Sequence, residues 1–144
     1  MQIRILIIIF IVLCIPSKIL GNTIEIVLKR DDKIITNIDV SEEIKYLSLL
    51  NPKLENINRK NLYDIAKSSL TREIIKKKEL KKILDIDANF NLNNSIEKKL
   101  INILAVENLN DLKAKIEKNN LKYEKVFFKL KIESLWNMYI FEKF

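Results

Sequence analysis

The chain has 144 residues and a formal net charge of +7, and this length allows one domain with a modest hydrophobic core. Its Lys residues are interspersed with Glu and Asp, as on solvated helix faces, so no nucleic acid partner is predicted. The absence of His and the single Cys, Cys14, exclude a histidine base, the usual zinc ligand sets and an internal disulfide. We therefore predict no metal and no cofactor, and any catalysis would depend on carboxylates, Lys or Tyr.

Residues 1–21 have the layout of a secretory signal peptide, with a short basic start, an apolar run from Ile5 to Ile15 and a final glycine. The apolar run is short for a membrane span. Ile19 stands where a cleavage site prefers a small residue, so an uncleaved N-terminal anchor is the alternative. We predict export to the periplasm, with residues 22–144 as the mature domain. Membrane contact is expected only if the signal stays uncleaved.

The mature domain opens with a predicted β-hairpin. Residues 23–29 alternate between apolar and polar side chains, as a half-buried strand does. The predicted inner face of this strand carries Ile24, Ile26 and Leu28. Asp31-Asp32 supplies a turn, and residues 33–35 return as a second strand. Two strands alone are marginally stable. The hairpin and the start of the first helix are therefore predicted to act as a clasp on the C-terminal helix, through Ile24, Ile26, Leu28 and Ile35.

Helices follow the hairpin. Thr36 and Asp39 have the spacing of a helix start, because the hydroxyl can cap a free N–H and the acid lies near the positive end of the helix dipole. This first helix is expected to end at Asn51-Pro52. The further predicted elements are a helix over 58–84, a polar connection over 85–94, a helix over 96–107 capped by Asn94 or Ser95, and a short helix from Asn110-Asp111 to Asn119-Asn120.

Residues 123–144 read as one last helix and hold seven of the eleven aromatic residues. Its apolar residues form two stripes about half a turn apart. One stripe carries Tyr123, Val126, Phe127, Leu130, Met138 and Phe141, and the other carries Phe128, Ile132, Leu135 and Tyr139. A helix that is apolar on two sides needs cover on both. Either it is the core helix, or one stripe stays partly open to a partner. The predicted fold is mainly α, a five-helix domain with a short N-terminal β-hairpin and this long helix packed through the middle.

Two stretches of the chain resemble a known family. Residues 31–40, a turn followed by an Ile-Thr strand end and an Asp-Val helix start, resemble the opening of the N-terminal domain of SurA-type periplasmic chaperones. Residues 121–140 resemble the closing helix of that domain, so the resemblance covers about residues 23–144. Arg30 departs from the pattern, as does the lack of Gly after the fourth helix. The chain holds no parvulin-type isomerase domain, so no catalytic residue is carried over.

The resemblance implies a holdase-type module that binds unfolded outer-membrane proteins without ATP and without catalysis in this chain. Phe and Met side chains can take up many apolar segments without demanding one sequence. The candidate client-binding residues are Phe128, Ile132, Tyr139, Met138 and Phe141. Two alternatives stay open: an N-terminal fragment of a parvulin-type peptidyl-prolyl isomerase, or a membrane-tethered envelope protein that docks a fixed partner.

Overall fold

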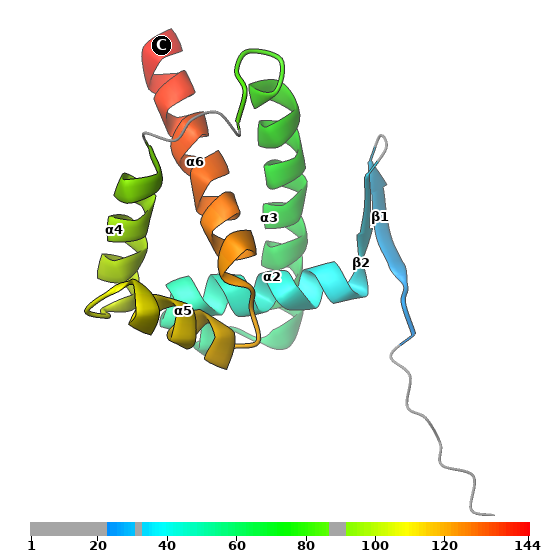
Figure 1. Cartoon of the computed structure of the whole chain (residues 1–144). Helices are drawn as coiled ribbons and strands as arrows, with labels where there is room; N and C mark the ends of the chain where they lie inside the picture. The colour runs from blue at the N-terminus through cyan, green and yellow to red at the C-terminus, as the bar shows by residue number, and fades with distance from the viewer. Residues whose placement is uncertain (1–22, 31–32, 87–91) are drawn as a thin grey trace, which may run out of the picture.

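The computed structural model describes residues 23–30, 33–86 and 92–144. Within these ranges the chain forms an antiparallel hairpin followed by five α-helices (Figure 1), which confirms the predicted fold class. The elements are β1 (Ile26–Arg30), β2 (Lys33–Thr36), α2 (Asn37–Leu50), the 3-10 turn η1 (Pro52–Asn56), α3 (Arg59–Leu80), α4 (Asn93–Leu104), α5 (Leu109–Lys118) and α6 (Tyr123–Lys143). The predicted signal peptide at 1–21 and the turn at Asp31-Asp32 lie outside the described residues.

Polar side chains begin three of the helices. The capping box predicted at the start of α2 is present: Asp39 N donates to Thr36 Oγ1 (3.2 Å), and Thr36 N donates to Asp39 Oδ2 (2.7 Å). These bonds satisfy N–H groups that have no partner within the helix. Asn58 and Asn108 cap α3 and α5 through their side-chain oxygens. The local sequence therefore determines where these helices begin.

The start of α4 differs from the prediction. This helix begins at Asn93, and Leu92 precedes it without a side-chain cap, so the predicted cap at Asn94 or Ser95 is wrong. The helix instead buries an apolar stripe of Ile96, Leu100 and Leu104. Tertiary packing, which contributes most of the stability of helices in proteins, outweighs the capping signal here.

Helix ends follow the predicted stop signals in α2 and α5, whereas α3 ends early and α4 ends at Leu104 instead of residue 107. α2 ends before Asn51-Pro52, and α5 is followed by Asn120 with a φ of 55°, the left-handed conformation that Asn tolerates. α3 ends at Leu80 instead of residue 84. Ile83, which the longer helix would have turned inward, is 52% exposed.

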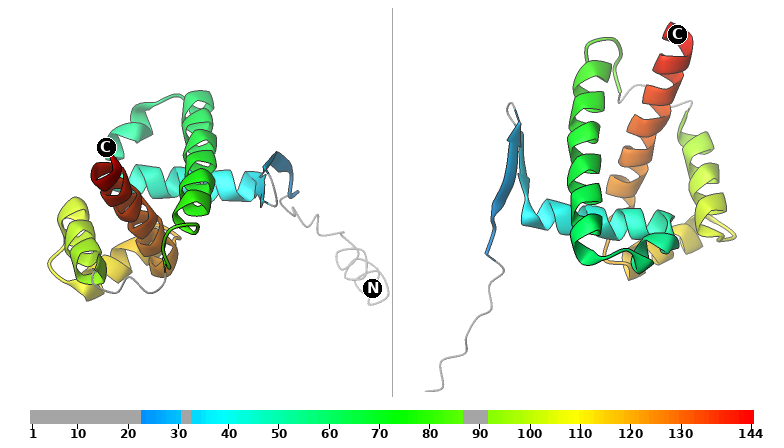
Figure 2. Two further views of the ribbon diagram at one scale, coloured as in Figure 1. Left: turned by 90° about the horizontal axis from the view of Figure 1, so that it is seen from above. Right: turned by 180° about the vertical axis from the view of Figure 1, so that it is seen from behind.

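α6 occupies the middle of the molecule. α3 lies on one side of it and α4 on the other, while α2 and α5 cross near the end where α6 begins (Figures 1 and 2). The buried apolar side chains form three clusters. The largest, between α2, α4, α5 and α6, includes Tyr46, Ile96, Leu100, Leu112, Ile116, Val126 and Leu130; the second contains Leu80, Ile86, Ile132 and Leu135; the third contains Ile35, Val40 and Ala66. α6 contributes to the first two clusters and so connects them.

The inner face of the hairpin differs from the prediction. Ile24 and Ile26 are 66% and 67% exposed, whereas Leu28 pairs with the buried Ile35. The pairing register is interrupted between Ile26 and Leu28, where Val27 is the extra residue of a β-bulge. Since a shift of one residue moves side chains to the other face of a strand, the residues before the bulge face solvent.

The hairpin packs on α2 and α3. Ile35 clusters with Val40 and Ala66, and Leu28 and Leu70 add to this contact. α3 lies between the hairpin and α6 (Figure 1), so the hairpin does not clasp the C-terminal helix as predicted. The apolar face of the hairpin instead packs on α2, the helix that immediately follows it, and on α3. The other part of the predicted clasp, the first half of α2, does contact α6 through Glu42 and Glu43.

The core role of α6 can be tested by truncating one buried and one exposed side chain. Ile132→Ala should lower the free energy of unfolding by about 2–5 kcal/mol, because Ile132 is fully buried and its truncation leaves a cavity. Phe141→Ala should change it by less than about 0.5 kcal/mol, because Phe141 is 89% exposed. Urea unfolding measures both. Equal losses at the two positions would contradict this placement of α6.

Candidate functional site

Exposure on α6 changes along the helix axis rather than from one stripe to the other. Val126 and Leu130 of the first stripe are buried, but Met138 and Phe141 of the same stripe are 45% and 89% exposed. In the second stripe Ile132 and Leu135 are buried, and Phe128 is half-buried. Beyond Leu135, α6 rises past the end of α4 (Figures 1 and 2). Among the described residues, the last turns of α6 therefore receive less cover than the first turns.

The five predicted client-binding residues have different surroundings. Ile132 belongs to the core and has no exposed surface, so it is removed from the candidate site. Phe128 is half-buried, with Lys77 Nζ 4.5 Å from the centroid of its ring. Tyr139 packs beside Trp136, with ring centroids 5.8 Å apart, and accepts a hydrogen bond from Lys143 Nζ (3.0 Å). Met138 and Phe141 remain available at the surface.

The structure adds two residues to this surface that the sequence prediction did not include. Ile140 is 36% exposed and Phe144 is 91% exposed. We name the four exposed side chains the apolar end of α6: Met138, Ile140, Phe141 and Phe144. Trp136 and Tyr139, on the same turns of α6, are half-buried and pack against the second core cluster. It offers aromatic and flexible apolar side chains to a partner.

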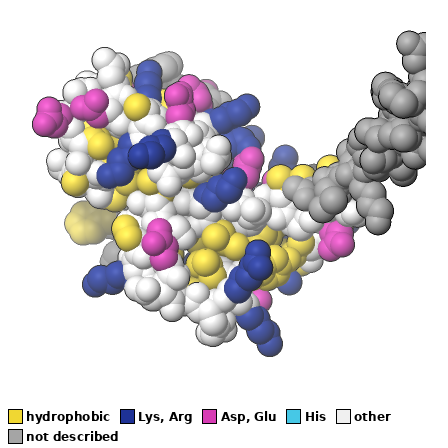
Figure 3. Space-filling model, turned by 90° about the horizontal axis from the view of Figure 1, so that it is seen from below, with side chains coloured by type: hydrophobic (Ala, Val, Ile, Leu, Met, Phe, Trp, Pro, Cys, Tyr) yellow, Lys and Arg dark blue, Asp and Glu magenta, His cyan; other side chains and the backbone are white. Residues whose placement is uncertain are grey.

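A second group of exposed apolar side chains lies on the hairpin and at the start of α2. Its members are Ile24, Ile26, Ile34 and Ile38. In the view from below, apolar side chains extend towards the hairpin, with Lys and Arg side chains beside them (Figure 3). This group is made only of β-branched side chains, which are stiffer than the Met138 side chain of the apolar end of α6.

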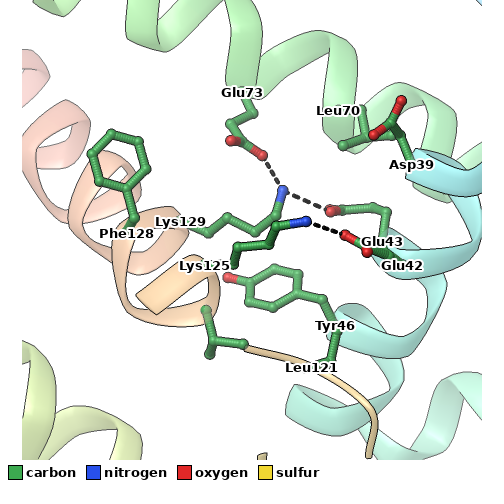
Figure 4. Close-up of a pocket in the computed structure, with 11 residues that line it drawn as sticks. Asp39, Glu42, Glu43, Tyr46, Leu70, Glu73, Leu121, Lys125, Phe128 and Lys129 are labelled. Carbon is green, nitrogen blue, oxygen red and sulfur yellow. Dashed lines mark hydrogen bonds and ion pairs between the residues drawn. The ribbon is translucent and has the colours of Figure 1, made fainter. Parts of the chain in front are cut away.

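Charged side chains join α6 to α2 and α3. Lys129 of α6 extends between Glu43 of α2 and Glu73 of α3, at one wall of a pocket of about 260 Å³ (Figure 4). Its Nζ atom lies 2.8 Å from Glu43 Oε2 and also contacts Glu73 Oε2. The contact with Glu43 is an ion pair by distance but lacks the geometry of a hydrogen bond. Three helices thus meet at one ammonium group.

Two further ion pairs continue this contact. Lys125 Nζ lies 2.6 Å from Glu42 Oε2, and Lys76 Nζ lies 2.6 Å from Glu133 Oε2. Lys125, Lys129 and Glu133 are spaced four residues apart, so they lie on one line of α6. We name the whole set the polar seam: Glu42, Glu43, Glu73, Lys76, Lys125, Lys129 and Glu133.

The charges of the seam shift the protonation of its buried members. Burial alone would lower the pKa of Lys129, but the negative charges of Glu43 and Glu73 outweigh burial, so its pKa is raised. Burial raises the pKa of Tyr46 well above its usual range, and the charges of Glu43, Glu133 and Glu73 raise it further. Both groups therefore keep their protons to a higher pH than an exposed Lys or Tyr does.

The sequence contained a signal for the seam that the prediction did not use. Glu43 lies three residues after Val40 and four before Leu47, so it shares the core-facing side of α2. A carboxylate at such a position is buried unless the helix turns away, and it then needs a cation. Because the charged residues were read as solvated, this need was overlooked.

The seam has the properties of a structural contact more than of a reactive site. Its acids are matched by lysines from facing helices, and within the described residues no group of three or more His, Cys, Asp or Glu side chains is placed to hold a metal ion.

None of the described helices has the length and apolar character that crossing a membrane requires. The apolar end of α6 is consequently the candidate functional site.

A scan against protein-family models found no match, and neither curated proteins nor solved structures yielded a similar chain. The resemblance to SurA-type chaperones therefore rests on residues 31–40 and 121–140 of the sequence.

The seam predicts a large effect of removing its central cation. Lys129→Met should lower the free energy of unfolding by about 3–5 kcal/mol, because it leaves the carboxylate of Glu43, 1% exposed, without a counter-ion. Lys125→Met is the matched control and should cost less than about 1 kcal/mol, since that pair is solvent-exposed. Adding Glu43→Gln to Lys129→Met should restore most of the loss. Urea unfolding that ranks the two lysine variants equally would contradict the burial of this charge.

The seam also predicts alkaline sensitivity. The folded state raises the pKa of Lys129 above its ordinary value of 10.5, so the stability from this charge is fully present below about pH 10.5 and is lost as the pH rises through the folded pKa. The raised pKa of Tyr46 acts in the same direction. The urea midpoint should fall between about pH 10 and 12 and should fall less steeply in the double variant Glu43→Gln/Lys129→Met. Parallel pH curves for the two proteins would refute the assignment.

Proposed function

We propose that this protein is an exported holdase-type chaperone module that binds unfolded outer-membrane proteins without ATP and carries out no catalysis itself. The observation that carries the proposal is the apolar end of α6, where Phe141 and Phe144 are 89% and 91% exposed. Isolated exposed apolar residues are ordinary, but large ones grouped on the end of a packed helix are typical of interaction sites. The signal-like residues 1–21 and the resemblance to SurA-type chaperones support the same proposal.

The chemistry of the site fits clients of this kind. Unfolded outer-membrane strands carry alternating apolar side chains that have no bilayer to cover them. Met138 is flexible and polarizable, so it adapts to side chains of different shape. The aromatic rings of Phe141 and Phe144 offer large apolar area for few rotatable bonds, which limits the entropy lost on binding. Binding at so small a surface is weak and reversible, which suits transfer of a client.

Protection of a client from aggregation tests the proposal. The purified protein should delay aggregation of an unfolded outer-membrane β-barrel protein at near-stoichiometric amounts and without nucleotide. The double variant Phe141→Ser/Phe144→Ser should lose most of this protection and keep its urea midpoint, because both side chains lie outside the core. Light scattering after dilution of the client from urea measures the protection.

Tyr63→Ser is the matched control, since Tyr63 is also a partly exposed aromatic residue but lies in the first turns of α3, away from the end of α6. It should protect as the parent protein does. If the folded parent gives no protection even in several-fold excess, the chaperone proposal fails and a docking protein for a fixed envelope partner becomes the better account. If the parent protects and the double variant protects equally, the function stands but the site lies elsewhere.

A further inference from the structure

The outer edge of β1 has no neighbouring strand within the described part of the chain. The sheet has two strands, and β2 lies on the side of the helices while β1 faces outward (Figures 1 and 2). The edge is also longer than β1 itself. Asn37 N donates to Glu25 O (3.0 Å), Glu25 N donates to Asn37 Oδ1, and Asn37 Nδ2 donates to Thr23 O. These three bonds hold the chain extended from Thr23 onward. Such an ordered, open edge is a template for a further strand.

The bulge determines which side chains along this edge share a face. Residues opposite each other in an antiparallel pair lie on one face. Leu28 with Ile35 faces the helices, and Lys29 with Ile34 faces away. By alternation Arg30 returns to the helix side. On the other side of the bulge Ile26 faces away and Glu25 faces the helix side. Glu25 lies at one end of the edge and Arg30 at the other, and their side chains therefore project from the same face of the sheet.

We propose that two copies of this chain associate through their β1 edges, antiparallel, about a two-fold axis between Val27 and Leu28. About this axis, each residue lies opposite a residue of the other copy that projects from the same face of the sheet. Glu25 lies opposite Arg30, and Ile26 lies opposite Lys29. Two carboxylate–guanidinium pairs then form by symmetry, one at each end of the contact. A slip by one residue would place opposed side chains on different faces, so the bulge selects this register.

The charge pattern favours a second copy over an unrelated strand as the occupant. Glu25 and Arg30 are exposed, and within the described part of the chain neither takes part in an ion pair, so both are available for pairing. Joining the edges also makes a four-stranded sheet, which is more stable than an isolated hairpin. The contact is small compared with a standard protein interface, so the dimer is weak. This inference does not depend on the proposed chaperone function.

Charge exchange across the axis tests the proposal. Glu25→Arg should weaken the dimer about tenfold, because it sets like charges opposite each other in two places. Arg30→Glu should do the same. The double variant Glu25→Arg/Arg30→Glu should associate like the parent, and so should an equimolar mixture of the two single variants, because each single variant supplies the charge that the other needs. Sedimentation equilibrium measures the dimer constant of each protein.

Glu55→Arg is the matched control, since it makes the same change of net charge at an exposed position of η1. It should leave the dimer constant unchanged. All the proteins carry the same residues 1–22, so association through that segment would be equal in all of them. A parent chain that stays monomeric up to about 1 mM overturns the proposal, and so does a double variant as weak as the single variants.

Amide hydrogen exchange locates the contact independently. Raising the protein concentration should slow exchange of the amides in β1, and this slowing should be lost in Glu25→Arg and return in the double variant. Slowing confined to the last turns of α6 would show association through the apolar end of α6 and overturn the edge pairing.

Discussion

The carboxylate of Glu43 is the constraint on which the packing of α6 depends. It lies on the core side of α2 with 1% of its surface exposed, and an unpaired charge at such a depth is very costly. Lys129 meets this need only if α6 has one rotation about its axis and one height against α2 and α3. Apolar packing alone is less selective, because apolar side chains tolerate rearrangement. We infer that the polar seam specifies the orientation of α6 more than it adds net stability.

Fixing the rotation of α6 also determines which of its residues reach the surface. With Lys129 turned towards α2 and α3, Val126 and Leu130 reach the cluster shared with α4 and α5, while Ile132 and Leu135 reach the cluster at the end of α3. Both stripes are thereby covered over the first part of the helix. α4 has 12 residues and α6 has 21, so among the described residues the end of α6 rises past α4 (Figure 1) and keeps exposed apolar side chains. The apolar end of α6 is a consequence of helix lengths, which the stripe pattern does not encode.

Local signals were sufficient to predict the order of the elements. They were not sufficient to predict the contacts between residues far apart in the sequence. Thr36 with Asp39, Asn58 and Asn51-Pro52 act on the backbone within a few residues, and each gave a correct helix limit. The bulge at Val27 changes no local signal but reverses the face of Ile24 and Ile26, so the predicted inner face of the first strand was wrong. Ile132 had the same period as Phe128 and Tyr139, which are only half-buried. Its burial depends on where α3 ends, which periodicity cannot supply.

The two surfaces lie on different parts of the molecule, and this has a consequence for binding. The hairpin packs on α2 and α3, while the apolar end of α6 rises beyond α4, so pairing through β1 would leave that end free in each copy (Figure 1). A particle with two weak sites holds a long unfolded chain more firmly than two separate sites do, because the second contact is made at high effective concentration. Each contact alone would dissociate readily, but the two together would bind a client firmly enough to retain it and still allow its transfer.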